Sequence, residues 1–236
     1  MKIPIPANEA KRLEALRRFR ILDTPSEPDF DDLAQLAAFI CETPIALISL
    51  VDAERQWFKA RVGLDTPETS RELAFCSYTI LGDEPMMVED TTVDDRFSDN
   101  PLVTSDPHIR FYAGAPLIDR EGNALGSLCV IDRKVRTLTP EQIKAMQALS
   151  RQVITQLELR RTTAELAESL ADLKTLHGLL PICAHCKGIR NDGGYWQSVE
   201  AYVAAHSDAD FTHGICPPCM EKHYPELFGN GQKTAK

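Results

Sequence analysis

The 236-residue sequence lacks any apolar run long enough to cross a membrane or to serve as the core of a secretory signal. It also lacks an excess of positive charge, because 26 Lys and Arg residues stand against 35 Asp and Glu residues, a formal net charge of -9. Nucleic acid and anionic lipid repel such a chain at long range. We therefore expect a cytoplasmic protein with no membrane partner and no nucleic-acid partner.

An export signal is missing, so the seven cysteines are not expected to form a disulfide framework. Metal binding or buried thiols should account for them instead. The chain is longer than a common domain of about 150 residues, which favours one domain with a smaller appendage. One local concentration of positive charge, which we interpret as a solvated helix face, comprises Lys11, Arg12, Arg17, Arg18 and Arg20.

Hydrophobic periodicity predicts the order of the elements. Apolar residues recur at helical spacing in residues 8–21 and 30–41. From residue 45 on, the apolar residues instead form compact or alternating runs, which favour strands. A long helix is expected to begin near Thr139-Pro140-Glu141. The predicted strands are residues 45–51, 56–62, 86–89, 111–118 and 124–131, with a short helix at 72–81.

The long helix carries a heptad pattern after residue 157. Leu159, Leu166, Leu173 and Leu180 recur every seven residues, and Thr163, Leu170 and His177 lie between them. This spacing predicts a parallel coiled coil and a homodimer. The alternative is an amphipathic helix packed on its own domain, because a short seam that contains Thr and His is a weak zipper.

Two CxxC pairs lie in the last part of the chain, Cys183 with Cys186 and Cys216 with Cys219. Each pair can offer two thiolates from one tight turn, and the four together complete a tetrahedral shell. We predict a structural zinc, with an iron-sulfur centre as the alternative. His185 and His213 are alternate ligands. Such a small module, which we compare to a zinc ribbon, needs a metal to fold.

Several motifs relate the chain to a known family. They are residues 20–25, 30–33, 44–52, 56–59, 111–117 (FYAGAPL) and 125–132 (LGSLCVID). With these motifs the N-terminal part resembles the GAF superfamily, in the type found in bacterial sensor histidine kinases and diguanylate cyclases. The tail, at residues 180–183, 194–196 and 213–217, is similar to an appendage of some bacterial signalling proteins.

The resemblance implies an α+β fold, with a central antiparallel sheet flanked by helices and a pocket for a small ligand. Neither the cyclic-nucleotide signature nor the bilin-binding Cys-His pair of the superfamily is present. If this chain follows the superfamily, residues that can bound the pocket, each of which can equally be plain core, are Trp57, Phe58, Phe75, Cys76, Asp90, Phe97, Phe111, Tyr112 and Cys129.

No kinase, cyclase or phosphodiesterase signature follows the helix, so we expect a protein without catalytic residues. In this hypothesis a small-molecule sensor acts through a dimerising helix on a zinc module that contacts a protein partner in signal transduction. One alternative is a cysteine-dependent redox enzyme of the free methionine sulfoxide reductase type, although Cys41, Cys76 and Cys129 do not reproduce its closely spaced trio. The other is a ligand-free structural adaptor.

The expected domain organisation has five parts. A first helix occupies residues 1–22, and the GAF-like sensor residues 23–156. A signalling helix then covers residues 157–180, and the four-cysteine zinc module residues 181–228. A disordered tail is expected at residues 229–236.

Overall fold

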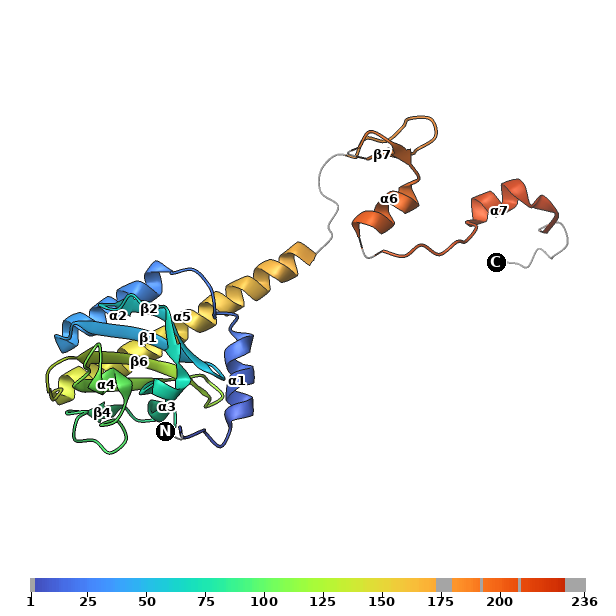
Figure 1. Cartoon of the computed structure of the whole chain (residues 1–236). Helices are drawn as coiled ribbons and strands as arrows, with labels where there is room; N and C mark the ends of the chain where they lie inside the picture. Colours follow the sequence, from blue (N-terminus) through green and yellow to red (C-terminus); the bar gives the residue numbers. More distant parts are fainter. Residues whose placement is uncertain (1–2, 173–179, 192, 208, 228–236) are drawn as a thin grey trace. The chain divides into compact units, whose positions relative to one another are not determined.

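A computed structural model describes residues 3–172, 180–191, 193–207 and 209–227. The chain divides into two compact units, Met1–Leu166 and Ala167–Lys236, which are described separately (Figure 1). The tail predicted at residues 229–236 and two residues of the heptad pattern, Leu173 and His177, lie outside the described residues.

A six-stranded antiparallel sheet forms the centre of the first unit. Its order is β3-β2-β1-β6-β5-β4, so consecutive hairpins flank the long pairing of β1 with β6. At this pairing Gly126 lets the strands approach closely, because a Cβ atom there would lie 1.9 Å from the Ser49 carbonyl oxygen. The strands are β1 (Ile45–Val51), β2 (Arg55–Val62), β3 (Glu68–Ser70), β4 (Met86–Val88), β5 (Phe111–Ile118) and β6 (Ala124–Asp132).

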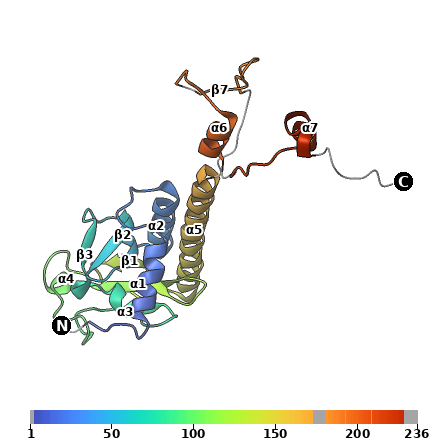
Figure 2. The same ribbon diagram turned by 90° about the vertical axis from the view of Figure 1, so that its right-hand side faces the viewer.

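Each face of the sheet has its own hydrophobic core, because side chains alternate along a strand. Helices α1 (Glu9–Arg18), α2 (Pro28–Cys41) and α5 (Pro140–Asp172) pack on one face, where Figure 2 shows them together. The other face is covered by short pieces, namely the 3₁₀ turn η1 (Arg71–Leu73), α3 (Cys76–Thr79) and α4 (Pro101–Thr104) with their loops. A loop-covered face leaves more room for a cavity than a face packed by long helices.

The structure confirms the predicted α+β architecture, with an antiparallel sheet, flanking helices and the long helix α5. Strands β1 and β5 have the predicted bounds. The helix predicted at residues 72–81 is instead η1 followed by α3, because the chain is extended at Ala74 between them. The short elements β3 and α4 were not predicted.

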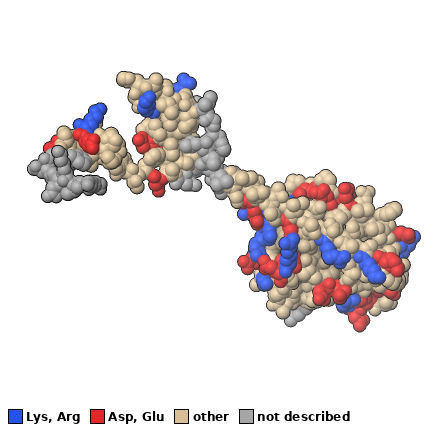
Figure 3. All heavy atoms as spheres, turned by 180° about the vertical axis from the view of Figure 1, so that it is seen from behind, with Lys and Arg blue, Asp and Glu red and all other residues tan. Residues whose placement is uncertain are grey.

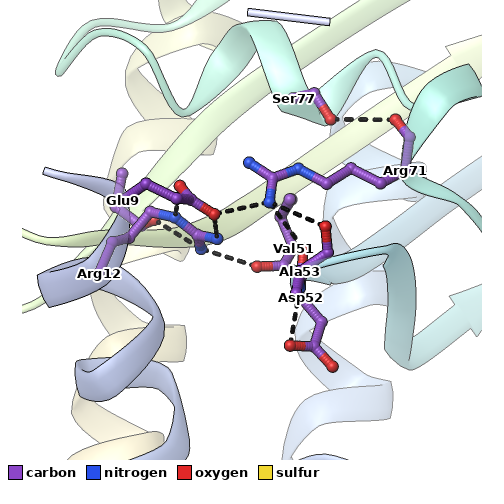
Figure 4. A network of polar contacts seen from close by, with 8 residues as sticks. Glu9, Arg12, Val51, Asp52, Ala53, Arg71 and Ser77 are labelled. Carbon is purple, nitrogen blue, oxygen red and sulfur yellow. Dashed lines mark hydrogen bonds and ion pairs between the residues drawn. The ribbon is translucent and has the colours of Figure 1, made fainter. Parts of the chain in front are cut away.

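Helix α1 is anchored by a polar network that Figure 4 shows between Glu9, Arg12 and Arg71. The Arg12 guanidinium is fully buried and donates to both Glu9 carboxylate oxygens at 2.8 Å and to the Val51 carbonyl oxygen at 2.7 Å. Arg71 donates to the same carboxylate at 2.6 Å and to the Asp52 carbonyl oxygen at 3.0 Å. Our interpretation of Arg12 as part of a solvated face is therefore wrong, because the end of β1 and the start of β6 supply buried carbonyl acceptors for it.

Helix α5 changes character along its length. Met146, Val153 and Leu157 are buried against the sheet. Arg160 donates to the Glu27 carboxylate at 3.0 Å, and Lys59 donates to the same oxygen at 2.6 Å. From residue 162 to residue 170 every residue is exposed.

The second unit contains short elements and little buried apolar surface. Its described elements are β7 (Ile189–Arg190), β8 (Trp196–Gln197), α6 (Val199–His206), α7 (Pro217–His223) and the turn η2 (Pro225–Leu227). Ile189 is the one buried hydrophobic residue that the structure describes there, whereas Trp196 and Ile215 are at least half exposed. Among the described helices, none combines the length and the apolar character needed to span a bilayer.

Candidate functional site

A cavity of about 180 Å³ lies on the sheet face opposite α1, α2 and α5. The sheet supplies its floor from β1, β2, β5 and β6, and loops after β2 and α4 supply its rim. The residues that line the cavity all lie in the described part of the chain, and none of them is a lysine or an arginine. They are Ile45, Leu47, Gln56, Phe58, Leu64, Thr66, Thr69, Phe75, Cys76, Leu102, Asp106, Pro107, Ile109, Tyr112, Cys129 and Ile131.

Gln56 is a buried polar residue in the wall of this cavity. It is only 5% exposed, and its Oε1 atom has no hydrogen-bond partner among the residues that the structure describes. Leaving a buried acceptor unpaired costs about 1 to 3 kcal/mol. Gln56 lines the cavity, so a rotation of its side-chain amide would let a ligand N–H or O–H group there donate to that oxygen.

A cluster of thiols and hydroxyls lies at the inner wall, where α3 meets β5 and β6. The Cys76 and Cys129 sulfur atoms are 3.8 Å apart, and both side chains are buried. The Ser127 hydroxyl donates to the Cys76 sulfur at 3.0 Å, and the Tyr112 hydroxyl donates to it at 3.3 Å. Gly114 leaves room for this arrangement, because a Cβ atom there would lie 2.3 Å from the Tyr112 hydroxyl oxygen.

The two thiols are not equivalent. Burial raises the pKa of Cys76, but hydrogen bonds to its sulfur from Cys129 and Ser127 outweigh that effect and lower the pKa below the ordinary value. The hydrogen bond to Cys76 and burial raise the pKa of Cys129 well above the ordinary value. Negative charge in the pair is therefore stabilised on Cys76.

The structure distributes the residues proposed for the pocket between four places. Phe58, Phe75, Cys76, Tyr112 and Cys129 line the cavity. Phe97 lies behind the wall, with its ring stacked on Phe75 at 4.2 Å between centroids. Trp57 and Phe111 belong to the core on the opposite face. Asp90 accepts hydrogen bonds from the Thr92 backbone and hydroxyl, away from the cavity.

Strand parity explains this division and could have identified the missed residues. Neighbours on a strand point to opposite faces, so the side chains of Trp57 and Phe58 do not both face this cavity, and neither do those of Phe111 and Tyr112. The same parity places Gln56 with Phe58 and Ile131 with Cys129. The loop residues Asp106 and Pro107 carry no comparable signal.

The three cysteines of the first unit do not form one cluster. Cys41 is buried in α2, in the core between the helices and the sheet, whereas Cys76 and Cys129 lie on the other face. Burial raises the pKa of Cys41 to about 11.

The four cysteines of the second unit form two local pairs. The Cys186 backbone N–H points to the Cys183 sulfur at 3.5 Å, in a turn closed by a 3.0 Å bond from the Lys187 N–H to the Cys183 carbonyl oxygen. Cys216 caps α7, and Cys219 lies in its first turn. Across the described residues, no group of three or more His, Cys, Asp or Glu side chains is placed to hold one metal ion.

Comparison with known proteins gives a family and relatives. The GAF domain model matches residues 26–157. The chain is 42% identical over 161 residues to a protein of Pseudomonas aeruginosa named cyclic di-GMP phosphodiesterase PA2567, a match that covers 68% of this chain and 27% of that protein. The chain thus spans about a quarter of the length of this relative.

Two solved structures illustrate the similarity of fold. The GAF domain of an Acinetobacter phosphoenolpyruvate-protein phosphotransferase is 18% identical, with a TM-score of 0.49 over 64% of this chain and 95% of the other. A type II free methionine-R-sulfoxide reductase of Thermoplasma acidophilum is 12% identical, with a TM-score of 0.45 over 55% of this chain and 92% of the other. Nothing about activity follows from likeness at this level.

The relative corrects one expectation. We expected a protein that is not an enzyme. A protein that is 42% identical over 68% of this chain is named a phosphodiesterase, so that expectation is wrong. The family match covers more than half of the sequence and agrees with the six-stranded sheet and its flanking helices. The chain belongs to the GAF domain family.

Proposed function

We propose that the GAF domain of this chain senses a small, mainly apolar molecule that carries one hydrogen-bond donor. The observation that carries the proposal is that Gln56, which lines the cavity, has a buried Oε1 atom with no hydrogen-bond partner among the described residues. An adaptor whose pocket is filled by its own side chains would leave neither the cavity nor the unpaired acceptor.

Size and charge narrow the class of ligand. A cavity of about 150 Å³ is enough for benzene, so a cavity of 180 Å³ accommodates a single small ring or a branched aliphatic group. Phosphate and carboxylate groups are disfavoured, because no basic side chain lines the cavity and Asp106 is acidic. We therefore propose a neutral or weakly cationic ligand.

In this proposal ligand binding to the GAF domain controls the turnover of cyclic di-GMP, because the relative of Pseudomonas aeruginosa is named a cyclic di-GMP phosphodiesterase. Cellular cyclic di-GMP measured in a deletion strain, complemented with wild type or with Gln56→Leu, tests this link. Equal levels in all strains would contradict it.

The four cysteines are proposed to hold a structural zinc ion. The donor set is soft, and each pair already lies in a tight turn or a first helical turn, which is the local geometry that tetrahedral sulfur coordination uses. With Ile189 as the one buried hydrophobic residue described in this unit, apolar burial contributes little to its folding, which favours a metal as the main stabilising element.

We also propose that α5 dimerises with a second copy of the chain. Leu159, Leu166 and Leu170 of the heptad pattern are exposed by 57% to 60%, so this apolar stripe is not used by the described part of the chain. Figure 3 shows acidic and basic side chains interspersed on one face of the first unit, so that face has no basic patch of the kind that binds nucleic acid. We further propose that the second unit binds a protein partner.

Phenol and toluene test the ligand site, because they have nearly the same size and only phenol donates a hydrogen bond. We expect phenol to raise the melting temperature of the reduced protein more than toluene does. In Gln56→Leu this preference should disappear, and the ligand-free variant should be more stable by about 1 kcal/mol because the unpaired acceptor is gone. Differential scanning fluorimetry measures both.

Gln35→Leu is the matched control, because Gln35 is exposed on α2. It should keep the wild-type preference for phenol. The proposal fails if neither compound stabilises the protein at millimolar concentration, or if Gln56→Leu responds to phenol as wild type does.

A further inference from the structure

The pair formed by Cys76 and Cys129 is unexplained by the proposed ligand site. Buried cysteine often serves only as a small hydrophobic residue. Cys41 fits that description, because apolar residues surround it and burial raises the pKa of its thiol. Cys76 differs, because two hydroxyl groups donate to its sulfur and a second thiol touches it.

The hydroxyl groups are held in place by neighbours. The Tyr112 hydroxyl lies 2.7 Å from the Thr79 hydroxyl and 3.4 Å from that of Ser127. Because Thr79 can donate to Tyr112, the Tyr112 proton is free to point at the Cys76 sulfur. Fixed donors around a sulfur stabilise the thiolate, which is the nucleophilic form of cysteine.

Both cysteines lie in the wall of the cavity together with Tyr112, and their side chains are 1% and 0% exposed. A molecule of a few atoms in the cavity is therefore next to the Cys76 side chain. A local shift of the wall, without unfolding of the domain, lets this molecule meet the sulfur.

We propose that Cys76 and Cys129 form an oxidative modification site, in which a small hydroperoxide in the cavity converts the two thiols to a disulfide. The Cys76 thiolate attacks one peroxide oxygen, the O–O bond breaks, and an S–O bond forms. The leaving hydroxide or alkoxide takes the proton that the Cys76 thiol gave up when it became a thiolate, and it departs as water or an alcohol. Cys76 is now a sulfenic acid.

The Cys129 thiol then attacks the Cys76 sulfur. The S–S bond forms as the S–O bond breaks, and the hydroxide leaves with the Cys129 proton as a second water. In total two thiols lose two electrons and the peroxide gains them. The separation of 3.8 Å places Cys129 in contact with Cys76, so only a small movement is needed for this step.

The disulfide changes the cavity wall. The sulfurs must approach from 3.8 Å to about 2.05 Å, which draws α3 toward β6. Phe75 precedes Cys76, lines the cavity and stacks on Phe97, so its ring moves with the helix. Oxidation should therefore alter ligand binding at the cavity.

Tryptic mapping of the 236-residue protein tests the proposal. Trypsin places Cys76 in residues 72–96, Cys129 in residues 121–133 and Cys41 in residues 21–55. After a brief exposure to equimolar hydrogen peroxide and alkylation of the remaining thiols, we expect peptides 72–96 and 121–133 to be joined. Cys41 should be oxidised at least about tenfold more slowly.

Variants separate the two steps. Cys129→Ser should leave a sulfenic acid on Cys76 that dimedone traps, whereas Cys76→Ser should leave Cys129 unmodified. Tyr112→Phe should slow the reaction several-fold, and Cys41→Ser should not change it. The circular dichroism spectrum of each variant is compared with that of wild type, so that a misfolded variant is recognised.

The inference is overturned if the wild-type peptides remain unlinked while the protein stays folded. It is equally overturned if the link forms only after unfolding, or if Cys41 is modified as fast as Cys76. None of these results depends on phenol binding, so this inference and the proposed ligand site can fail separately.

Discussion

At the scale of single residues, Glu9 keeps two buried arginines in place. Its carboxylate contacts Arg12, which is fully buried, and Arg71, which is 6% exposed. Removing one partner of a buried ion pair leaves an uncompensated charge and is more costly than the pair is stabilising. The contacts of these residues join α1 to the loop after β1 and to η1.

We predict that Glu9→Gln lowers the free energy of unfolding by about 2 to 4 kcal/mol. Urea titration followed by far-UV circular dichroism measures the change. Glu14→Gln is the matched control on the exposed side of α1 and should cost less than about 0.5 kcal/mol. A loss for Glu9→Gln no larger than that of the control would contradict the role of the network.

The same residue predicts a pH dependence. Burial raises the pKa of Glu9, but hydrogen bonds from Arg12 and Arg71 outweigh it and lower the pKa to about 2 from 4.5. A lowered folded-state pKa contributes stability that is complete above 4.5 and is lost as the pH falls toward 2. With solvent screening, about 1 to 2 kcal/mol of the difference between wild type and Glu9→Gln should vanish over that range.

At the scale of elements, α5 has a buried part and an exposed part in one helix. Its first part is buried against the sheet through Val153 and Leu157, and the part that follows exposes Leu166 and Leu170. A helix that is docked at one end and exposed at the other can transmit a change in the docked part to a second copy of the chain.

We predict that the Leu166→Glu/Leu170→Glu variant is monomeric. Size-exclusion chromatography with light scattering should give twice 26.3 kDa for wild type and 26.3 kDa for the variant. Two carboxylates in an apolar seam are strongly unfavourable, because they cannot be solvated there. Ala164→Glu, on the other side of the helix, is the control and should stay dimeric. Monomeric wild type at micromolar concentration would exclude the dimer.

At the scale of the whole molecule, the two units depend on different sources of stability. The first unit has a hydrophobic core on each face of its sheet. The second has little described apolar burial and two cysteine pairs. Loss of metal should therefore affect the second unit alone.

We predict one zinc ion per chain in wild type by elemental mass spectrometry, and none in Cys183→Ser/Cys216→Ser. Zinc coordination contributes on the order of 10 kcal/mol to such a module, so the double variant should lose the second unit to limited proteolysis while residues 26–157 survive. Cys41→Ser should retain zinc. Stoichiometric zinc in the double variant would refute the assignment.

The sequence by itself determined the regular elements of the first unit. The apolar runs of β1 and β5 and the helical period of α2 are local properties of the chain, so their positions follow from it. The three-residue strand β3 and the short helix α4 are too brief to show a period.

Tertiary structure alone decided which side chains meet. Residues 76 and 129 are far apart in sequence, and only the packing of α3 on β6 brings their sulfurs to 3.8 Å. Arg12 has the sequence context of a solvated residue, yet it is buried and donates hydrogen bonds to carbonyl oxygens of residues distant in the sequence. Gln56 becomes an unpaired acceptor only because loops close a cavity above it. The physical reason is that periodicity is set by neighbours along the chain, whereas burial and pairing are set by its path through space.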